Sequence, residues 1–144
     1  MVITGVADRI PEKIKHIVYV DAMLPEDAES VFSLNTDDRS KMFLELAETK
    51  GKGYSIPPYW DDWGKDVPHP LGTFRQSISL INPDREKIPA TYILTIEIGQ
   101  TTDSFSKYAE RAKKKNWAYY ELPTGHNAQR TMPNEYAEIL MNIK

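Results

Sequence analysis

Apolar residues recur along this chain at two spacings, one typical of helices and one typical of strands. In residues 1–10 the apolar side chains lie three or four positions apart, which predicts an amphipathic helix. A β-branched and aromatic run at 16–20, ending on Asp21, predicts a buried strand. Similar runs at 91–96 and 117–122 predict two more strands. No capping residue precedes the first helix, so its pattern begins in mid-element.

Three further helices are expected between and after these strands. Asp37 or Asp38 is positioned to cap the first of them, which glycines end. Asp103 or Ser104 is expected to cap the second, and the third is expected from about Pro133, a residue favoured in the first helical turn. The second helix carries an apolar stripe that should be buried, formed by Phe105, Tyr108, Ala109 and Ala112.

The order helix, strand, insertion, strand, helix, strand, helix is typical of a parallel sheet with crossover helices. We therefore predict an α/β fold with about three parallel strands, in a single partial domain over residues 1–144. Residues 25–75, between the first two strands, are predicted to form a cap-like insertion. Within it, residues 54–75 combine many prolines with many aromatic side chains, which favours an ordered loop region over regular structure.

Composition excludes several classes of function. The charged fraction of 27% and the hydrophobic fraction of 40% indicate an ordinary globular protein rather than a disordered or membrane-spanning one. A net charge of -3 and a single short Lys113–Lys115 run give no basis for a nucleic-acid partner. The chain has no cysteine, and its three histidines are not at metal-ligand spacing, so we expect no metal. We expect a cytoplasmic location and no membrane partner, because neither a transmembrane run nor a signal-peptide pattern is present.

Two segments of the chain resemble a known family. Residues 1–31 include Val18-Tyr19-Val20-Asp21-Ala22, and residues 117–140 include Glu121-Leu122-Pro123-Thr124-Gly125-His126. Both resemble a bacterial subfamily of α/β-hydrolases that is related to plant methylesterases and hydroxynitrile lyases. The segment Pro68-His69-Pro70-Leu71-Gly72-Thr73-Phe74 also looks like the family's segment before the penultimate strand. The resemblance covers most of the chain, and the matching segments follow one another in the same order as in the family.

This resemblance implies hydrolysis of a small-molecule carboxylic ester by Ser-His-Asp acyl transfer, with no metal or organic cofactor. In that subfamily a Gly-His-Ser-Tyr-Gly-Gly nucleophile turn directly precedes a helix like residues 1–12. The resemblance thus implies that the chain is the C-terminal half of the fold and starts just after the nucleophile. The nearest imitation of a Gly-x-Ser-x-Gly turn, at 53–57, lacks a preceding strand and the second glycine. We therefore expect the isolated chain to be inactive.

The resemblance makes His126 the general base, although a histidine after a loop glycine is more often a surface residue. Its acid partner should lie at the carboxyl end of a neighbouring strand. Asp21 ends the first strand, a position that some α/β-hydrolases use for the triad acid, and Glu97 ends the second. We rank Asp21 first, because the sequence after Glu97 lacks the family's Asp pattern, and keep Glu97 as the alternative. The alternative, purely structural role for Asp21 is to cap a helix or a turn.

The candidate substrate-binding residues are Trp60, Trp63, His69 and Phe74. The aromatic side chains can form an apolar pocket under a cap, and His69, between two prolines, can line it. Structural roles are the more frequent explanation, because aromatics commonly cover a core and His69 can hydrogen-bond within its own turn.

Two other functions fit the sequence. The chain can be a non-catalytic small α/β binding domain, whose exposed strand edge at 16–21 is free to pair with a partner. It can also be a fragment of a hydroxynitrile-lyase-like enzyme, which needs the same serine.

Overall fold

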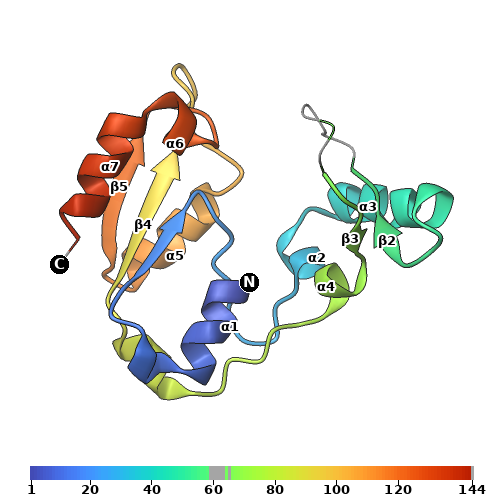
Figure 1. The fold of residues 1–144 in the computed structure, drawn as a ribbon, viewed down its shortest axis with the longest axis horizontal. Helices are drawn as coiled ribbons and strands as arrows, with labels where there is room; N and C mark the ends of the chain where they lie inside the picture. The colour runs from blue at the N-terminus through green and yellow to red at the C-terminus, as the bar shows by residue number, and fades with distance from the viewer. Residues whose placement is uncertain (59–63, 65, 144) are drawn as a thin grey trace. The chain divides into compact units, whose positions relative to one another are not determined.

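The computed structural model describes residues 1–58, 64 and 66–143 (Figure 1). The chain divides into two compact units. Residues Val2–Leu24 and Asn82–Lys144 form the first, here called the sheet unit, and Pro25–Ile81 together with Met1 form the second, the insertion unit. The insertion unit covers nearly the segment predicted as a cap-like insertion, and its role as a cap stays a prediction.

A three-stranded parallel sheet in the order β1-β4-β5 forms the centre of the sheet unit (Figure 1). The strands are β1 (Ile17–Val20), β4 (Ala90–Thr95) and β5 (Ala118–Leu122). All six residues of β4 are buried, as expected for a central strand with both faces covered. The prediction of an α/β fold with three parallel strands is therefore confirmed.

Helices and short turns accompany this sheet: α1 (Val2–Arg9), η1 (Pro11–Lys13), η2 (Pro83–Lys87), α5 (Ser106–Lys114), α6 (Ala128–Thr131) and α7 (Pro133–Met141). One face of the sheet packs against α6 and α7, in a cluster built on Ile93, Leu122 and Ala128. Tyr19 and Tyr92 alternate with these residues along β1 and β4, so they point to the other face, where their rings stack with centroids 6.4 Å apart.

The start of α5 differs from the prediction that Asp103 or Ser104 caps it. The helix begins at Ser106, and the side chain of Phe105 at its N-cap position makes no capping bond. Instead, Asp103 Oδ1 accepts a hydrogen bond from the Phe105 amide, and Ser106 Oγ accepts one from the Asp103 amide, both at 2.8 Å. These two bonds close a turn before the helix, which places Phe105 only partly in the core.

The insertion unit contains α2 (Val31–Leu34), α3 (Asp37–Lys50), β2 (Ser55–Ile56), β3 (His69–Pro70) and α4 (Gly72–Arg75). Thr36 caps α3 by accepting a hydrogen bond from the Arg39 amide, so the prediction of Asp37 or Asp38 as the cap is wrong by one or two positions. The prediction of a loop over 54–75 is also wrong in part. The antiparallel pair β2–β3 and one turn of helix form there, since a two-residue strand tolerates a proline.

The two chain segments that enter and leave the insertion unit are hydrogen-bonded to each other. The Ala28 amide donates to the Ile78 carbonyl at 2.9 Å, and the Ile78 amide donates to the Glu29 carbonyl at 2.8 Å. The Leu80 amide also donates to Asp27 Oδ1 at 2.8 Å. Beyond this pairing, the unit has its own core of Phe43, Ala47, Ile56 and Leu71.

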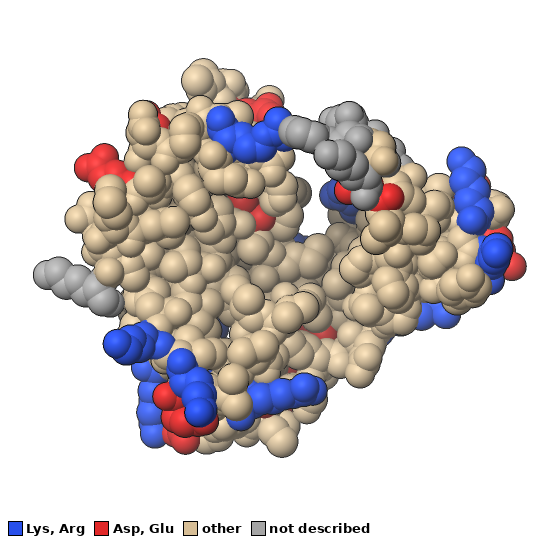
Figure 2. All heavy atoms as spheres, viewed as in Figure 1, with Lys and Arg blue, Asp and Glu red and all other residues tan. Residues whose placement is uncertain are grey.

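Charged side chains of both signs gather at the lower edge of Figure 2, over η2. Lys87 pairs with Asp84 at 2.6 Å, and Lys115 pairs with Glu86 at 3.0 Å. Lys87 and Lys115 are therefore each paired with an acidic neighbour. Among the described helices, none is long and apolar enough to cross a membrane.

Candidate active site

Asp21 follows the last residue of β1 and has an unusual backbone. Its amide continues the sheet by donating to the Ile93 carbonyl at 2.7 Å, but its φ is +43°. Few residues other than glycine adopt this left-handed conformation, and Asp is among those that tolerate it best. Such strained residues concentrate at active sites and binding sites. The side chain is 1% exposed, so its carboxylate must be satisfied by protein groups.

The loop after β5 brings His126 to this carboxylate. His126 Nδ1 lies 2.6 Å from Asp21 Oδ2, and the Thr95 amide at the end of β4 donates to Asp21 Oδ1 at 3.2 Å. Both carboxylate oxygens are therefore held. A carboxylate at Nδ1 favours the neutral tautomer with its proton on Nδ1, which leaves the lone pair of Nε2 for proton transfer. The side chain of His126 is 61% exposed, so the ring is accessible.

The imidazole of His126 also stacks on an aromatic ring. The centroids of His126 and Phe105 are 5.3 Å apart, and their planes differ by 14°. The hydrogen bond and the stacking contact together define the position and the tilt of the imidazole. Phe105 was predicted to lie in the buried stripe of a helix, and no sequence signal pointed to its contact with His126.

Tyr92 fixes the residue that follows Asp21. Its hydroxyl donates to the Ala22 carbonyl at 2.6 Å and accepts from the Ala22 amide at 3.2 Å. Burial raises the pKa of Tyr92, whereas the hydrogen bond to Ala22 opposes that change, so the phenol stays protonated at neutral pH. This contact was not foreseen, because Tyr92 belongs to an apolar run typical of a buried strand.

Glu97, the alternative acid, lies against the histidine loop. A Cβ atom placed on Gly125 would be 3.1 Å from Glu97 Oε1, which shows how closely this side chain approaches the loop. The hydrogen-bond partner of His126 Nδ1 is Asp21. The structure thus brings Asp21 and His126 together and gives Glu97 a neighbouring position.

A hollow of about 540 Å³ lies beside His126. Its lining residues all have polar side chains apart from one glycine, and they come from the end of β4 and from the loops after β4 and β5: Thr95, Glu97, Gln100, Thr102, Asp103, Ser104, Thr124, Gly125 and His126. Across the described part of the chain, no group of three or more His, Cys, Asp or Glu residues is arranged to hold a metal ion.

Two of the predicted substrate-binding residues lie in the insertion unit. His69 Nε2 is 2.6 Å from Thr73 Oγ1, and its ring packs edge-on against Phe74 at 4.9 Å. Phe74 also contacts Phe43, with ring centroids 5.1 Å apart, and so covers the core of this unit. Both side chains have structural partners, and their contact with substrate stays a prediction. Trp60 and Trp63 lie outside the described residues.

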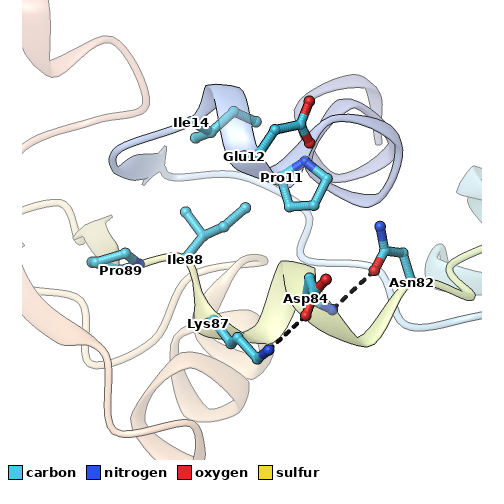
Figure 3. Close-up of a pocket in the computed structure, with 8 residues that line it drawn as sticks. All are labelled: Pro11, Glu12, Ile14, Asn82, Asp84, Lys87, Ile88 and Pro89. Carbon is cyan, nitrogen blue, oxygen red and sulfur yellow. Dashed lines mark hydrogen bonds and ion pairs between the residues drawn. The ribbon is translucent and has the colours of Figure 1, made fainter.

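A second hollow, of about 410 Å³, lies at the other end of the sheet, where β1 and β4 begin (Figure 3). Its lining combines Pro11, Glu12, Ile14, Asn82, Asp84, Lys87, Ile88 and Pro89. Lys87 is paired with Asp84, and Asn82 Oδ1 accepts from the Asp84 amide at 3.0 Å. Because these polar groups satisfy one another, this hollow is a poorer candidate for chemistry than the one at His126.

Comparison with known proteins identifies hydrolases that are similar to this chain in sequence or in fold. A carbendazim-hydrolysing esterase from Nocardioides sp. (strain SG-4G) is 32% identical over 160 residues, which covers 97% of this chain and 65% of that esterase. An extracellular α/β-hydrolase from a Paenibacillus species superposes with a TM-score of 0.76 at 20% identity, covering 97% of this chain and 66% of that one. A pyrethroid hydrolase from Sphingobium faniae superposes with a TM-score of 0.65 at 17% identity, covering 97% and 64%. No protein-family model matches the chain.

These likenesses show that the chain has the α/β-hydrolase fold. Its sequence is similar to that of an esterase, and it corresponds to a C-terminal portion of the fold. The chain spans about 65% of the length of the curated relative that it matches.

Proposed function

We propose that Asp21 and His126 are the acid and the general base of a Ser-His-Asp triad that hydrolyses a small-molecule ester. The observation that carries this proposal is the 2.6 Å contact between the buried Asp21 carboxylate and Nδ1 of an exposed imidazole. In hydrolytic triads the acid member is a buried carboxylate that orients the histidine in this way. The relation to a carbendazim-hydrolysing esterase supports an ester-type substrate.

Each group has a defined task in this reaction. Nε2 of His126 takes the proton of the serine hydroxyl as the serine oxygen attacks the ester carbonyl carbon. The same nitrogen returns the proton to the departing alcohol, which leaves an acyl-enzyme that water then hydrolyses. Asp21 keeps the imidazole in the correct tautomer and stabilises the imidazolium that forms. The reaction needs no metal or organic cofactor.

The nucleophile is proposed to come from outside these residues. Among the described residues, no serine hydroxyl lies within hydrogen-bonding distance of His126. A general base contributes about 10²–10⁴-fold in an assembled site and little without a nucleophile. We therefore expect the 144-residue chain alone to hydrolyse p-nitrophenyl acetate at the background rate. Turnover well above background that His126→Ala abolishes would show that this chain holds its own nucleophile.

The triad assignment is tested by supplying the rest of the fold. The chain is fused to the portion of the Nocardioides esterase that it does not match, and ester hydrolysis by the fusion is measured. We expect His126→Ala to lower kcat by about 10²–10⁴-fold and Asp21→Asn by a comparable factor. Glu97→Gln is the matched control, because it neutralises a carboxylate beside the same loop. A loss with Glu97→Gln as large as that with Asp21→Asn would contradict Asp21 as the acid.

A further inference from the structure

The hydrogen bond between Asp21 and His126 by itself fixes only one atom of the imidazole. It holds Nδ1 at 2.6 Å from Asp21 Oδ2, whereas the proposed base is Nε2, on the opposite side of the ring. A hydrogen bond of this kind tolerates about 30° of tilt before it weakens steeply. The His126 side chain is 61% exposed and lies in the loop between β5 and α6, so little of it is enclosed. A second contact is needed to fix the direction of Nε2.

The face of the Phe105 ring supplies that second contact. The two rings are nearly parallel, since their planes differ by 14°, and their centroids are 5.3 Å apart. A ring stacked on the imidazole opposes the tilting that the hydrogen bond alone allows. The two contacts also come from different elements, because Asp21 follows β1 and Phe105 precedes α5. The imidazole is therefore held at one edge and on one face.

Phe105 is itself held by its neighbours. Its amide donates to Asp103 Oδ1 at 2.8 Å, and its carbonyl accepts from the Tyr108 amide at 2.8 Å. Its ring also contacts the ring of Tyr108, with centroids 6.1 Å apart, and Tyr108 is only 1% exposed. Because both the backbone and the ring of Phe105 have anchored partners, its face is a fixed surface for the imidazole.

A second phenylalanine–histidine contact, in the insertion unit, has a different geometry. The rings of Phe74 and His69 are 4.9 Å apart but cross at 77°, and His69 Nε2 is bound to the hydroxyl of Thr73. Among the described residues, by contrast, no group is hydrogen-bonded to Nε2 of His126. Only the histidine whose Nε2 is available is thus stacked face to face.

We infer that Phe105 is a positioning residue for His126, whose stacked face orients the imidazole on Asp21 so that Nε2 is aimed at the serine proton. The same face suits the charged ring, because a cation within about 6 Å of an aromatic centroid is attracted to that face. The inference rests on the proposed function only in naming the proton that Nε2 takes. The effect of Phe105 on the motion of the imidazole is independent of it.

The test is NMR of the full 144-residue chain, isotopically labelled at histidine. One quantity is the order parameter of the C–H bonds in the His126 ring. The other is the rate at which its Nδ1 proton exchanges with water, which requires the bond to Asp21 to open. Phe105→Leu removes the aromatic face but keeps an apolar side chain, and Phe105→Tyr keeps the face. Phe74→Leu is the matched control, because it removes the aromatic partner of His69 instead.

We expect Phe105→Leu to lower the order parameter from about 0.85, typical of rigid groups, toward less than about 0.6. Exchange of the Nδ1 proton should become about 2–10-fold faster, the factor that an aromatic pair contributes. Phe105→Tyr should match the unchanged chain in both quantities, and Phe74→Leu should alter only the His69 signals. The amides of β4 should be equally protected in every variant, which shows that the fold is kept.

A His126 ring that is as rigid in Phe105→Leu as in the unchanged chain overturns the inference. A Phe105→Tyr ring as loose as that of Phe105→Leu also overturns it, because the aromatic face would then be irrelevant. Equal loosening of His126 by Phe74→Leu does the same. If Phe105→Leu fails to fold, Phe105→Ile replaces it with the same expected results. A merely structural role predicts a lower free energy of unfolding with neither His126 quantity changed.

Kinetics of an active fusion with the Nocardioides portion separate this inference from the triad. Phe105→Leu should lower kcat by about 2–10-fold and leave KM unchanged, because it alters the base and not the substrate contacts. An unchanged kcat overturns the positioning role. A loosened ring, together with ester hydrolysis that His126→Ala does not affect, would reject the triad but keep the stacking contact. Hydrolysis that needs His126, together with a rigid ring in Phe105→Leu, would do the reverse.

Discussion

Asp21 and His126 are 105 positions apart in the chain, and their side chains meet at 2.6 Å. Three elements make this contact: β1 ends at Asp21, β4 supplies the Thr95 amide for the second carboxylate oxygen, and the loop after β5 supplies the histidine. All three strands are parallel, so their carboxyl ends lie at one edge of the sheet. The contact is thus a product of sheet topology.

The contact predicts the tautomer of His126. In the neutral imidazole the proton should reside on Nδ1, where Asp21 accepts it, and Asp21→Asn should shift the proton toward Nε2 because an amide does not enforce this tautomer. Nitrogen-15 NMR of the imidazole distinguishes the two forms. The control variant Glu97→Gln should leave the spectrum unchanged. An identical tautomer in the native chain and in Asp21→Asn would contradict the structure.

Tyr92→Phe removes both hydrogen bonds to Ala22 while keeping the ring in the core. We expect the free energy of unfolding to fall by about 1–3 kcal/mol, because the backbone groups of Ala22 lose their partner. Urea denaturation measures the loss. The control Tyr120→Phe changes a side chain that is 38% exposed and should cost no more than about 0.5 kcal/mol. Equal costs for the two variants would show that the bridge to Ala22 contributes nothing.

The buried tyrosines predict a loss of stability at alkaline pH. Burial raises the pKa of both Tyr19 and Tyr92 above the ordinary value of about 10, and hydrogen bonds to Thr4 and Ala22 only partly oppose it. Below pH of about 10 both states keep these protons, so the stability is fully present. Above that pH the unfolded chain loses them first, and stability should fall by about 1.4 kcal/mol per pH unit for each tyrosine.

The measurement is the free energy of unfolding between neutral pH and strongly alkaline pH. Tyr92→Phe starts from a lower stability, but it should decline less steeply above pH of about 10, since one of the two groups is gone. A decline as steep as that of the native chain would exclude Tyr92 as a contributor.

Two glycines in the insertion unit should respond oppositely to alanine. A Cβ atom at Gly51 would lie 1.7 Å from the Ser55 carbonyl oxygen, so Gly51→Ala must displace backbone and should cost about 1–3 kcal/mol or more. Gly72, in α4, has no atom within 4 Å of that position, and Gly72→Ala should stabilise by about 0.5–1 kcal/mol. Thermal unfolding of the two variants compares them directly. A higher melting temperature for Gly51→Ala than for Gly72→Ala would contradict the backbone arrangement.

The strands and their order were predictable because the apolar runs are short, β-branched and separated by helical stripes. The order of elements then required a parallel sheet, and a parallel sheet brings the ends of neighbouring strands together. This is why Asp21 could be ranked as a partner of His126 from the sequence. Topology alone does not separate Asp21 from Glu97, because Glu97 also follows a strand at the same edge. The ranking of Asp21 first came from the family resemblance and the sequence after Glu97.

Other parts of the site were beyond prediction because they depend on where side chains reach in space. Tyr92 lies in an apolar run that predicts a buried strand, yet its hydroxyl reaches the backbone of Ala22. Phe105 fits a helical stripe, yet a turn closed by Asp103 and Ser106 moves it out to His126. The predicted N-cap of α3 was wrong for a simpler reason. Thr36 and its two acidic neighbours are all good cap residues, so the sequence does not distinguish among them.

The paired entry and exit of the insertion unit have a consequence for how such a protein can diversify. Ala28 and Glu29 are tied to Ile78, so the chain leaves this unit beside the point where it enters. Residues 30–77 are thus joined to the remainder of the chain through two adjacent, hydrogen-bonded segments. Such a module can be lengthened, shortened or exchanged without altering the register of β1 against β4. Substitutions, insertions and deletions within residues 30–77 therefore leave the Asp21–His126 contact unchanged.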